Sequence, residues 1–234
     1  MPSLFRLVVR LQVTRGRAVA LAAVALVGIL IGAAVGRSDV ADPARAASRF
    51  VASYGLGLLV PVTALVFSSA ALGDPAEDAT LVYLWLRPIP RWRIVAAAEL
   101  ASLAVAVPFG VVPTAIAAAV TGQGSRLVAG ATLAALLAVA GYTTLFLGLG
   151  LVVRRALAWG LVYVLIWEGF VARSGTAAAR LSILVYARSL LAEVAHTDPP
   201  RLAAATPTSV IVPLAVAGAA LALTTRALGR VDVK

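Results

Sequence analysis

The sequence contains no cysteine, which excludes disulfides, thiolate metal sites and cysteine nucleophiles. It contains one histidine, His196, which excludes most zinc and haem arrangements. Because this histidine lies in a predicted external segment, we expect no Ser/His/Asp catalytic set. No Gly-rich loop followed by Lys-Ser or Lys-Thr occurs, so the chain lacks a P-loop for nucleotide hydrolysis. We therefore expect a chain that is not an enzyme and that binds neither a metal nor a cofactor.

Charged residues are also scarce, at 13% of the 234 residues, whereas soluble domains carry about 25%. Hydrophobic residues make up 62%, and the mean hydropathy is +0.99. A soluble globule needs more polar surface than this composition supplies. The composition indicates an integral membrane protein.

Acidic residues are few relative to basic ones, ten against twenty, which gives a net charge of +10. All the basic residues except Lys234 are arginines. In a membrane protein such residues hold loops against anionic headgroups. We therefore expect the lipid membrane, and not nucleic acid, to be the partner of these charges.

Long apolar runs dominate what is present, and a helix needs about 20 such residues to cross a bilayer. The division between the fourth and fifth runs is placed at Arg154-Arg155, because two arginines inside the bilayer would be costly. The sequence predicts an all-α membrane domain over residues 1–234 with six spans, which are Ala18–Gly36, Phe50–Leu72, Ile94–Val120, Leu127–Val153, Ala156–Ala172 and Thr208–Thr225.

The N-terminal residues 1–17 predict an interfacial helix, because Leu4, Leu7, Val8 and Leu11 share one helical face. The apolar run after it is longer than the 7–15 residues typical of a cleaved signal, which favours a retained first span. Twelve of the twenty basic residues fall on the side that holds both termini. This bias predicts a multi-pass protein of the cell membrane with both termini in the cytoplasm.

Residues 173–207 form a predicted external segment between the fifth and sixth spans. Within it, Arg180–His196 has the apolar periodicity of an amphipathic helix, and Asp198-Pro199-Pro200 ends it. Two interpretations of its depth stay open: the helix caps the spans from outside, or it dips partly into them.

Several glycines and prolines lie within the predicted spans and affect how these helices pack and bend. Gly28, Gly32 and Gly36 give two successive GxxxG steps, a face on which another helix can pack closely. Prolines inside spans remove a backbone hydrogen bond and are expected to bend or break their helices. Four positions are of this kind: Pro61, Pro108, Pro113 and Pro213.

One polar segment, residues 73–93, interrupts the apolar runs. Asp74 is a candidate N-cap, Pro75 suits the first helical position, and Pro88 ends the helix at Arg87. The predicted helix has about twelve residues, roughly 18 Å, which is too short to span a membrane. From its physics alone, it is either a rigid lever that transmits motion to the spans or an interfacial anchor for the loop.

The order Glu77-Asp78-Ala79-Thr80-Leu81, followed by Leu84, Pro88 and Arg91, resembles the corresponding loop of ABC-2 type permeases. Ala79 departs from the glycine usual in that family, and Glu99 stands where lysine is common. The stretch Tyr163–Gly169 is also similar to the region of the family's fifth span. By this resemblance, residues 73–93 contain a cytoplasmic coupling helix, and its ATPase-coupling residues are Glu77, Asp78, Thr80, Leu81, Leu84, Pro88 and Arg91.

The resemblance implies a permease subunit of an ATP-binding-cassette exporter. Its partners would be an ABC ATPase subunit, which carries ATP and Mg, and a second permease copy, identical or related. The chain itself would form the translocation path and bind no cofactor.

Two acids lie within the predicted spans, Glu99 and Glu168, and both are candidate membrane-embedded polar sites. We expect Glu168 to pair with an external arginine such as Arg173 or Arg180. Two rival functions remain: an ion-coupled secondary transporter, in which Glu99 or Glu168 would titrate, and a membrane scaffold or resistance accessory without transport of its own.

Overall fold

The structure is a computed structural model that describes residues 2–77, 90–170, 175–199, 203 and 206–229. Every regular element in these ranges is a helix, which confirms the all-α prediction for the described part of the chain.

Five helices are long and apolar enough to cross a membrane. Two of them are composite, with a π-helical stretch joining two α-helices without a break. The five are α2 (Arg15–Arg37), α3–η1–α4 (Pro43–Phe50, Val51–Leu59, Val60–Glu77), α6–η2–α7 (Arg91–Ala106, Val107–Val111, Val112–Ala119), α8 (Ser125–Val152) and α12 (Thr206–Leu228). The chain is therefore a multi-pass membrane protein, and each of these five helices overlaps one of the six predicted spans.

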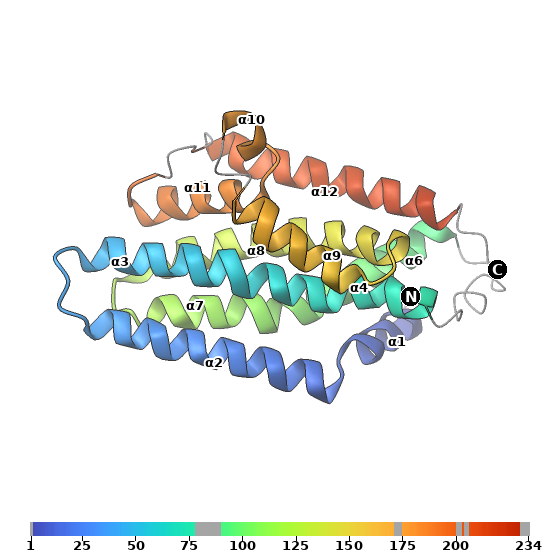
Figure 1. Ribbon diagram of the computed structural model, residues 1–234, viewed down its shortest axis with the longest axis horizontal. Coiled ribbons are helices and arrows are strands. Elements are labelled where there is room, and N and C mark those ends of the chain that lie inside the picture. The colour runs from blue at the N-terminus through green and yellow to red at the C-terminus, as the bar shows by residue number, and fades with distance from the viewer. Residues whose placement is uncertain (1, 78–89, 171–174, 200–202, 204–205, 230–234) are drawn as a thin grey trace.

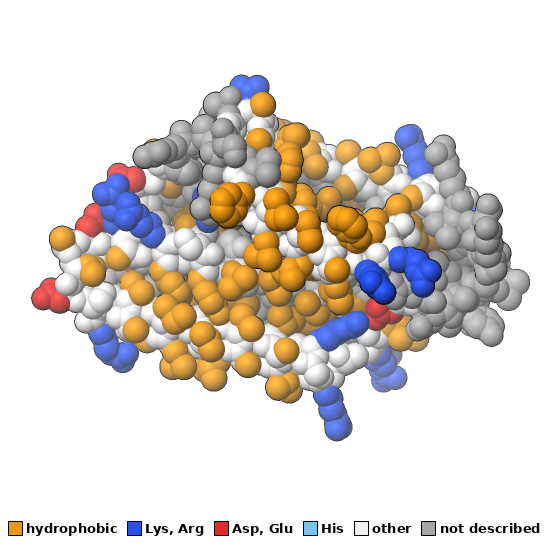
Figure 2. Space-filling model, in the orientation of Figure 1, with side chains coloured by type: hydrophobic (Ala, Val, Ile, Leu, Met, Phe, Trp, Pro, Cys, Tyr) orange, Lys and Arg blue, Asp and Glu red, His pale blue; other side chains and the backbone are white. Residues whose placement is uncertain are grey.

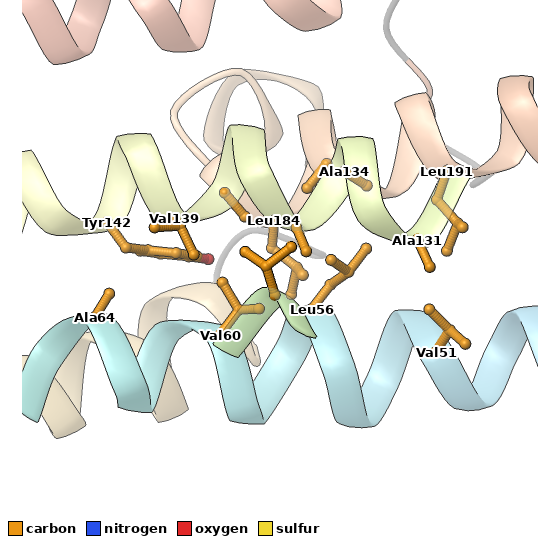
Figure 3. Close-up of a cluster of buried hydrophobic side chains, with 14 of the residues drawn as sticks. Val51, Leu56, Val60, Ala64, Ala131, Ala134, Val139, Tyr142, Leu184 and Leu191 are labelled. Atoms are coloured by element: carbon orange, nitrogen blue, oxygen red, sulfur yellow. The ribbon is translucent and has the colours of Figure 1, made fainter. Parts of the chain in front are cut away.

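Helix α8 lies at the centre of the bundle and packs against α4, α7, α12 and α11 (Ile183–Ala195) (Figure 1). Figure 3 shows the main core cluster, in which side chains of η1 and α4 such as Leu56 and Val60 meet α8 and α11. Alanines fill much of the α8 side, including Ala131 and Ala134. Small side chains of this kind let helix backbones approach closely where the hydrophobic effect between helices is absent.

Helices α2 and α12 lie on the flanks of the bundle. Only 22% of the apolar window of each is buried, against 67% for α8. Their exposed side chains are large and apolar, for example Leu30 on α2 and Leu223 on α12, and Figure 2 shows such side chains spread over the α2 flank. A surface of this kind suits lipid chains, and this agrees with a bundle whose flanks face the bilayer.

The fifth predicted span, Ala156–Ala172, is shorter than expected. Its described helix comprises α9 (Ala156–Val162) and η3 (Tyr163–Glu168), seven and six residues long, and residues 171–172 lie outside the described part. Tyr163 contacts Phe146 of α8, with ring centroids 6.0 Å apart. Because about 20 residues are needed to cross a bilayer, the helix Ala156–Glu168 reaches along only part of α8.

Helix α11 runs beside the other part of α8. Ile183 lies against Gly141, and Leu191 lies against Gly130. The buried residues Leu184, Ala187 and Leu191 belong to the same core cluster as the alanines of α8. The predicted helix Arg180–His196 is observed as α11, and it packs within the bundle against α8. This packing favours the interpretation in which the helix dips partly into the spans. The short α10 (Thr176–Ala179) precedes it.

The N-terminal helix α1 (Pro2–Gln12) confirms the prediction of a helix before the first span. Val8 and Gln12 are buried, whereas Leu7 and Leu11 are 51% and 44% exposed. The predicted apolar face of this helix is thus divided. Val8 packs in the bundle, whereas Leu7 and Leu11 are exposed and available to a membrane interface. The hydroxyl of Thr14 caps α2 by accepting from the Arg17 backbone N–H.

The span prolines do not break their helices. Pro61 and Pro108 adjoin or lie in π-helical stretches, and Pro113 and Pro213 lie within α7 and α12. In the π-helical stretches the bonds run five residues back, as from Val60 N–H to the Gly55 carbonyl and from Val112 N–H to the Val107 carbonyl. This wider turn accommodates the missing proline donor, which is why the helix continues.

The glycine stripe of α2 is the predicted close-packing face. A Cβ atom at Gly32 would lie 2.6 Å from the Ala117 carbonyl oxygen, and one at Gly36 would lie 2.7 Å from that of Thr121. Gly28 lies against the ring of Tyr54. Helix α2 therefore packs on α7 at a distance that only glycine permits.

Candidate functional site

Most residues of the predicted coupling segment fall outside the described part of the chain. Asp78, Thr80, Leu81, Leu84 and Pro88 are among these. Glu77 is the last residue of α4, and Arg91 is the first residue of α6. The structure therefore describes the two ends of the segment and leaves the predicted helix a prediction.

The start of that helix was predicted at Asp74, and this is wrong. Helix α4 continues through Asp74 and Pro75 to Glu77. The Asp74 carboxylate does not cap a new helix; it accepts hydrogen bonds from Arg17 Nη1 and Nη2 at 3.2 and 3.1 Å. The Asp74 carboxylate is occupied by its ion pair with Arg17. Helix α4 continues past Asp74, so no new helix begins there that Asp74 could cap.

Both described ends of the segment are bonded to other helices. Asp74 joins the end of α4 to the start of α2 through Arg17. Arg91 Nη1 donates to the Gly229 carbonyl oxygen at 3.4 Å, which joins the start of α6 to the residue after α12. Both links lie at the end of the bundle where α1 is found (Figure 1). A displacement of the segment would therefore act on α2 and α12 as well as on α4 and α6.

Glu99 belongs to a buried group of polar side chains, which we name the inner polar cluster: Gln12, Glu99, Ser102 and Thr143. Thr143 Oγ1 of α8 donates to Glu99 Oε1 at 2.6 Å, and Gln12 Nε2 of α1 donates to Ser102 Oγ at 2.8 Å. Glu99 and Ser102 are three residues apart on α6 and so lie on one face. The cluster therefore connects α1, α6 and α8.

Two oxygens of the inner polar cluster, Glu99 Oε2 and Gln12 Oε1, have no hydrogen-bond partner among the described residues. Buried acceptors without partners are costly, and the carboxylate oxygen of Glu99 can accept a proton. No group of three His, Cys, Asp or Glu residues occurs within the described ranges, so those ranges present no protein-built metal site of that type. Sequence reasoning found Glu99 but missed its hydrogen-bond partner Thr143. It also missed the Gln12–Ser102 pair of the same cluster, although Gln12 is a rare amide in an apolar helix.

Glu168 caps α11 from a distance in sequence. Its Oε1 accepts from the Tyr163 hydroxyl at 3.0 Å and from the Ile183 N–H at 3.1 Å. Its Oε2 accepts from the Leu184 N–H at 3.4 Å and from the Ser182 hydroxyl. A carboxylate at the first N–H groups of a helix satisfies donors that have no intrahelical partner and interacts favourably with the helix dipole.

The predicted pairing of Glu168 with an external arginine is wrong for Arg180, which forms no ion pair with it in the described part of the chain. Arg173 lies outside the described residues. The carboxylate is buried, at 2% exposure, and the helix N-terminus and two hydroxyls supply the donors that an arginine would have supplied. The sequence indicates only the local part of this arrangement, a serine at the start of a helix. Ser182 N-caps α11 by accepting from the Val185 N–H at 3.1 Å.

Comparison with known proteins yields no match: no family model matches the chain, and neither the curated proteins nor the solved structures contain a significant match.

Proposed function

We propose that this chain is the membrane-spanning permease subunit of an ATP-binding-cassette exporter. In this proposal residues 73–93 dock on a separate ATPase subunit, and a second permease copy completes the translocation path. ATP and Mg bind to the partner ATPase. The exporter lies in the cell membrane with both termini in the cytoplasm.

The observation that carries the proposal is the bonding of the two ends of the segment. A docking element must pass force to the spans, and a loop that only anchors itself at the interface needs no such links. The Arg17–Asp74 ion pair and the Arg91–Gly229 hydrogen bond attach the segment to α2 and α12. The resemblance of residues 77–91 to the loop of ABC-2 type permeases supports the same conclusion.

The experiment is affinity purification of the tagged chain from the membranes of its own host. We expect an ATPase with a GxxxxGK[ST] motif to copurify, and the double variant Glu77→Ala/Leu81→Ala to lose it while membrane insertion is unchanged. A matched control is Arg126→Ala, because Arg126 is the second residue of α8, at the opposite end of the bundle. Unchanged copurification in the double variant would count against the proposal.

A second candidate function, an ion-coupled secondary transporter, is favoured by one observation. Glu99 is 5% exposed and one of its oxygens has no partner among the described residues, as expected of an acid that takes up a proton inside a membrane. Transport by ATP-depleted vesicles under a proton gradient, abolished by Glu99→Gln, would support this candidate. Transport that requires ATP and survives Glu99→Gln would exclude it.

A further inference from the structure

A basic pocket of about 450 Å³ lies between α3 and α11, at the end of the bundle opposite α1. Figure 2 shows basic and acidic side chains gathered at this end of the molecule, over α3 and the end of α11. We name it the arginine pocket, and the polar residues that matter here are Arg45, Ser48, Arg49, Arg188, Thr197 and Asp198.

The arginine pocket carries an excess of positive charge. Three guanidinium groups line it, from Arg45, Arg49 and Arg188, and one carboxylate, from Asp198. Arg45 and Arg49 are one turn apart on α3, so their charges repel each other. The described lining of the pocket therefore holds more positive than negative side chains.

The arginines differ in how they are held. Arg188 Nε and Nη2 donate to the Ala52 carbonyl oxygen at 3.2 and 3.1 Å, which fixes this guanidinium at the pocket wall. Arg45 pairs with Asp198 at 2.9 Å, but both side chains are largely exposed, at 51% and 69%. Exposed pairs of this kind contribute little and are readily exchanged. Arg49 forms no ion pair within the described residues.

The arginine pocket adjoins the start of a long apolar stretch. Arg49 directly precedes Phe50, after which the apolar residues of η1 begin. Two hydroxyls, Ser48 Oγ and Thr197 Oγ1, lie 3.1 Å apart in the same wall. Guanidinium groups beside hydroxyls form the donor set that binds phosphate oxygens, since the guanidinium fork matches phosphate in a bidentate manner.

We propose that the arginine pocket binds a phosphate-bearing anion, with Arg49 and Arg188 as its guanidinium ligands. Arg45 joins them when the anion displaces Asp198. The phosphate belongs either to the headgroup of an anionic phospholipid or to a soluble phosphate ester, and both present the same oxygens to the pocket. This site is independent of whether the chain is a permease.

The test uses the purified full-length chain in detergent. Native mass spectrometry during titration with phosphatidylglycerol measures lipid binding, and phosphatidylcholine serves as the lipid without net charge. A parallel thermal-unfolding titration with glycerol 1-phosphate measures binding of the soluble ester. We expect Arg49→Gln to weaken binding roughly tenfold, the loss of one charge-assisted hydrogen-bonding group. Asp198→Asn is expected to strengthen it, because the competing carboxylate is removed.

Matched controls separate the pocket from general charge effects. Arg126→Gln removes a positive charge near the same end of the bundle, and Glu193→Gln removes an exposed negative charge from α11; neither residue lines the pocket. Phosphatidylglycerol binding alone identifies a lipid headgroup, and binding of glycerol 1-phosphate as well identifies a site open to soluble esters. The proposal is overturned if neither anion binds, or if Arg49→Gln and Arg126→Gln weaken binding equally.

Discussion

At the scale of the residue, buried polar side chains define the chemistry of this membrane bundle. Glu168 accepts hydrogen bonds from two backbone N–H groups and two hydroxyls. Among the described residues, Glu99 is bonded through Oε1 alone, by Thr143. Two acids of the same type therefore have different roles. Glu168 is a structural cap, and Glu99 retains an oxygen available for a proton.

The capping role makes a prediction for Glu168→Gln. The variant keeps the shape of the side chain, but its amide group presents donors to the N–H groups of α11 and removes the charge that favours the helix N-terminus. We expect the free energy of unfolding in detergent to fall by about 1–3 kcal/mol. Glu193→Gln is the matched control on the same helix, because Glu193 is exposed and is expected to change stability little. Equal effects of the two variants would contradict the capping role.

At the scale of the element, the glycine stripe of α2 sets how closely this helix packs on α7. A Cβ atom at Gly32 would meet a backbone carbonyl oxygen 2.6 Å away, which no side-chain movement relieves. The contact therefore requires glycine at this position, although only 22% of the apolar window of α2 is buried in the bundle.

We accordingly expect Gly32→Val to lower the free energy of unfolding by about 1–3 kcal/mol, the usual cost of overpacking. Gly218→Val is the control: a Cβ atom at Gly218, in α12, meets nothing within 4 Å. Thermal unfolding of both variants in the same detergent measures the difference. A Gly32→Val protein as stable as the Gly218→Val protein would show that α2 does not pack on α7 in this way.

The elements also show what sequence patterns can and cannot predict. Apolar length located the five long helices, and the GxxxG spacing located the α2 face, because both depend on local sequence. The sequence predicts separate helices over Ala156–Ala172 and Arg180–His196. The capping of the second by Glu168 was not predicted, since it depends on Glu168 reaching residues 182–184 across an intervening segment. The start of a helix at Asp74 was predicted wrongly for the same reason: its partner, Arg17, is distant in sequence.

At the scale of the whole molecule, the proposed orientation places α1 and the ends of the 78–89 segment in the cytoplasm. The absence of native cysteine allows a direct check with single introduced cysteines. Asp39 lies between α2 and α3, and Arg226 lies near the end of α12; both are exposed. We expect a membrane-impermeant maleimide to label Asp39→Cys in intact cells and Arg226→Cys only after permeabilisation. The reverse pattern would contradict the orientation and place the coupling segment outside.

The central claim is that residues 73–93 contact an ATPase, and site-specific photo-crosslinking tests it most directly. A photoreactive amino acid in place of Thr80 is activated in cells, with Arg126 replaced in the same way as the control at the other end of the bundle. The account predicts that the Thr80 position, and not the Arg126 position, crosslinks to a protein with a GxxxxGK[ST] motif. Crosslinks from Thr80 only to this chain or to lipid would contradict it.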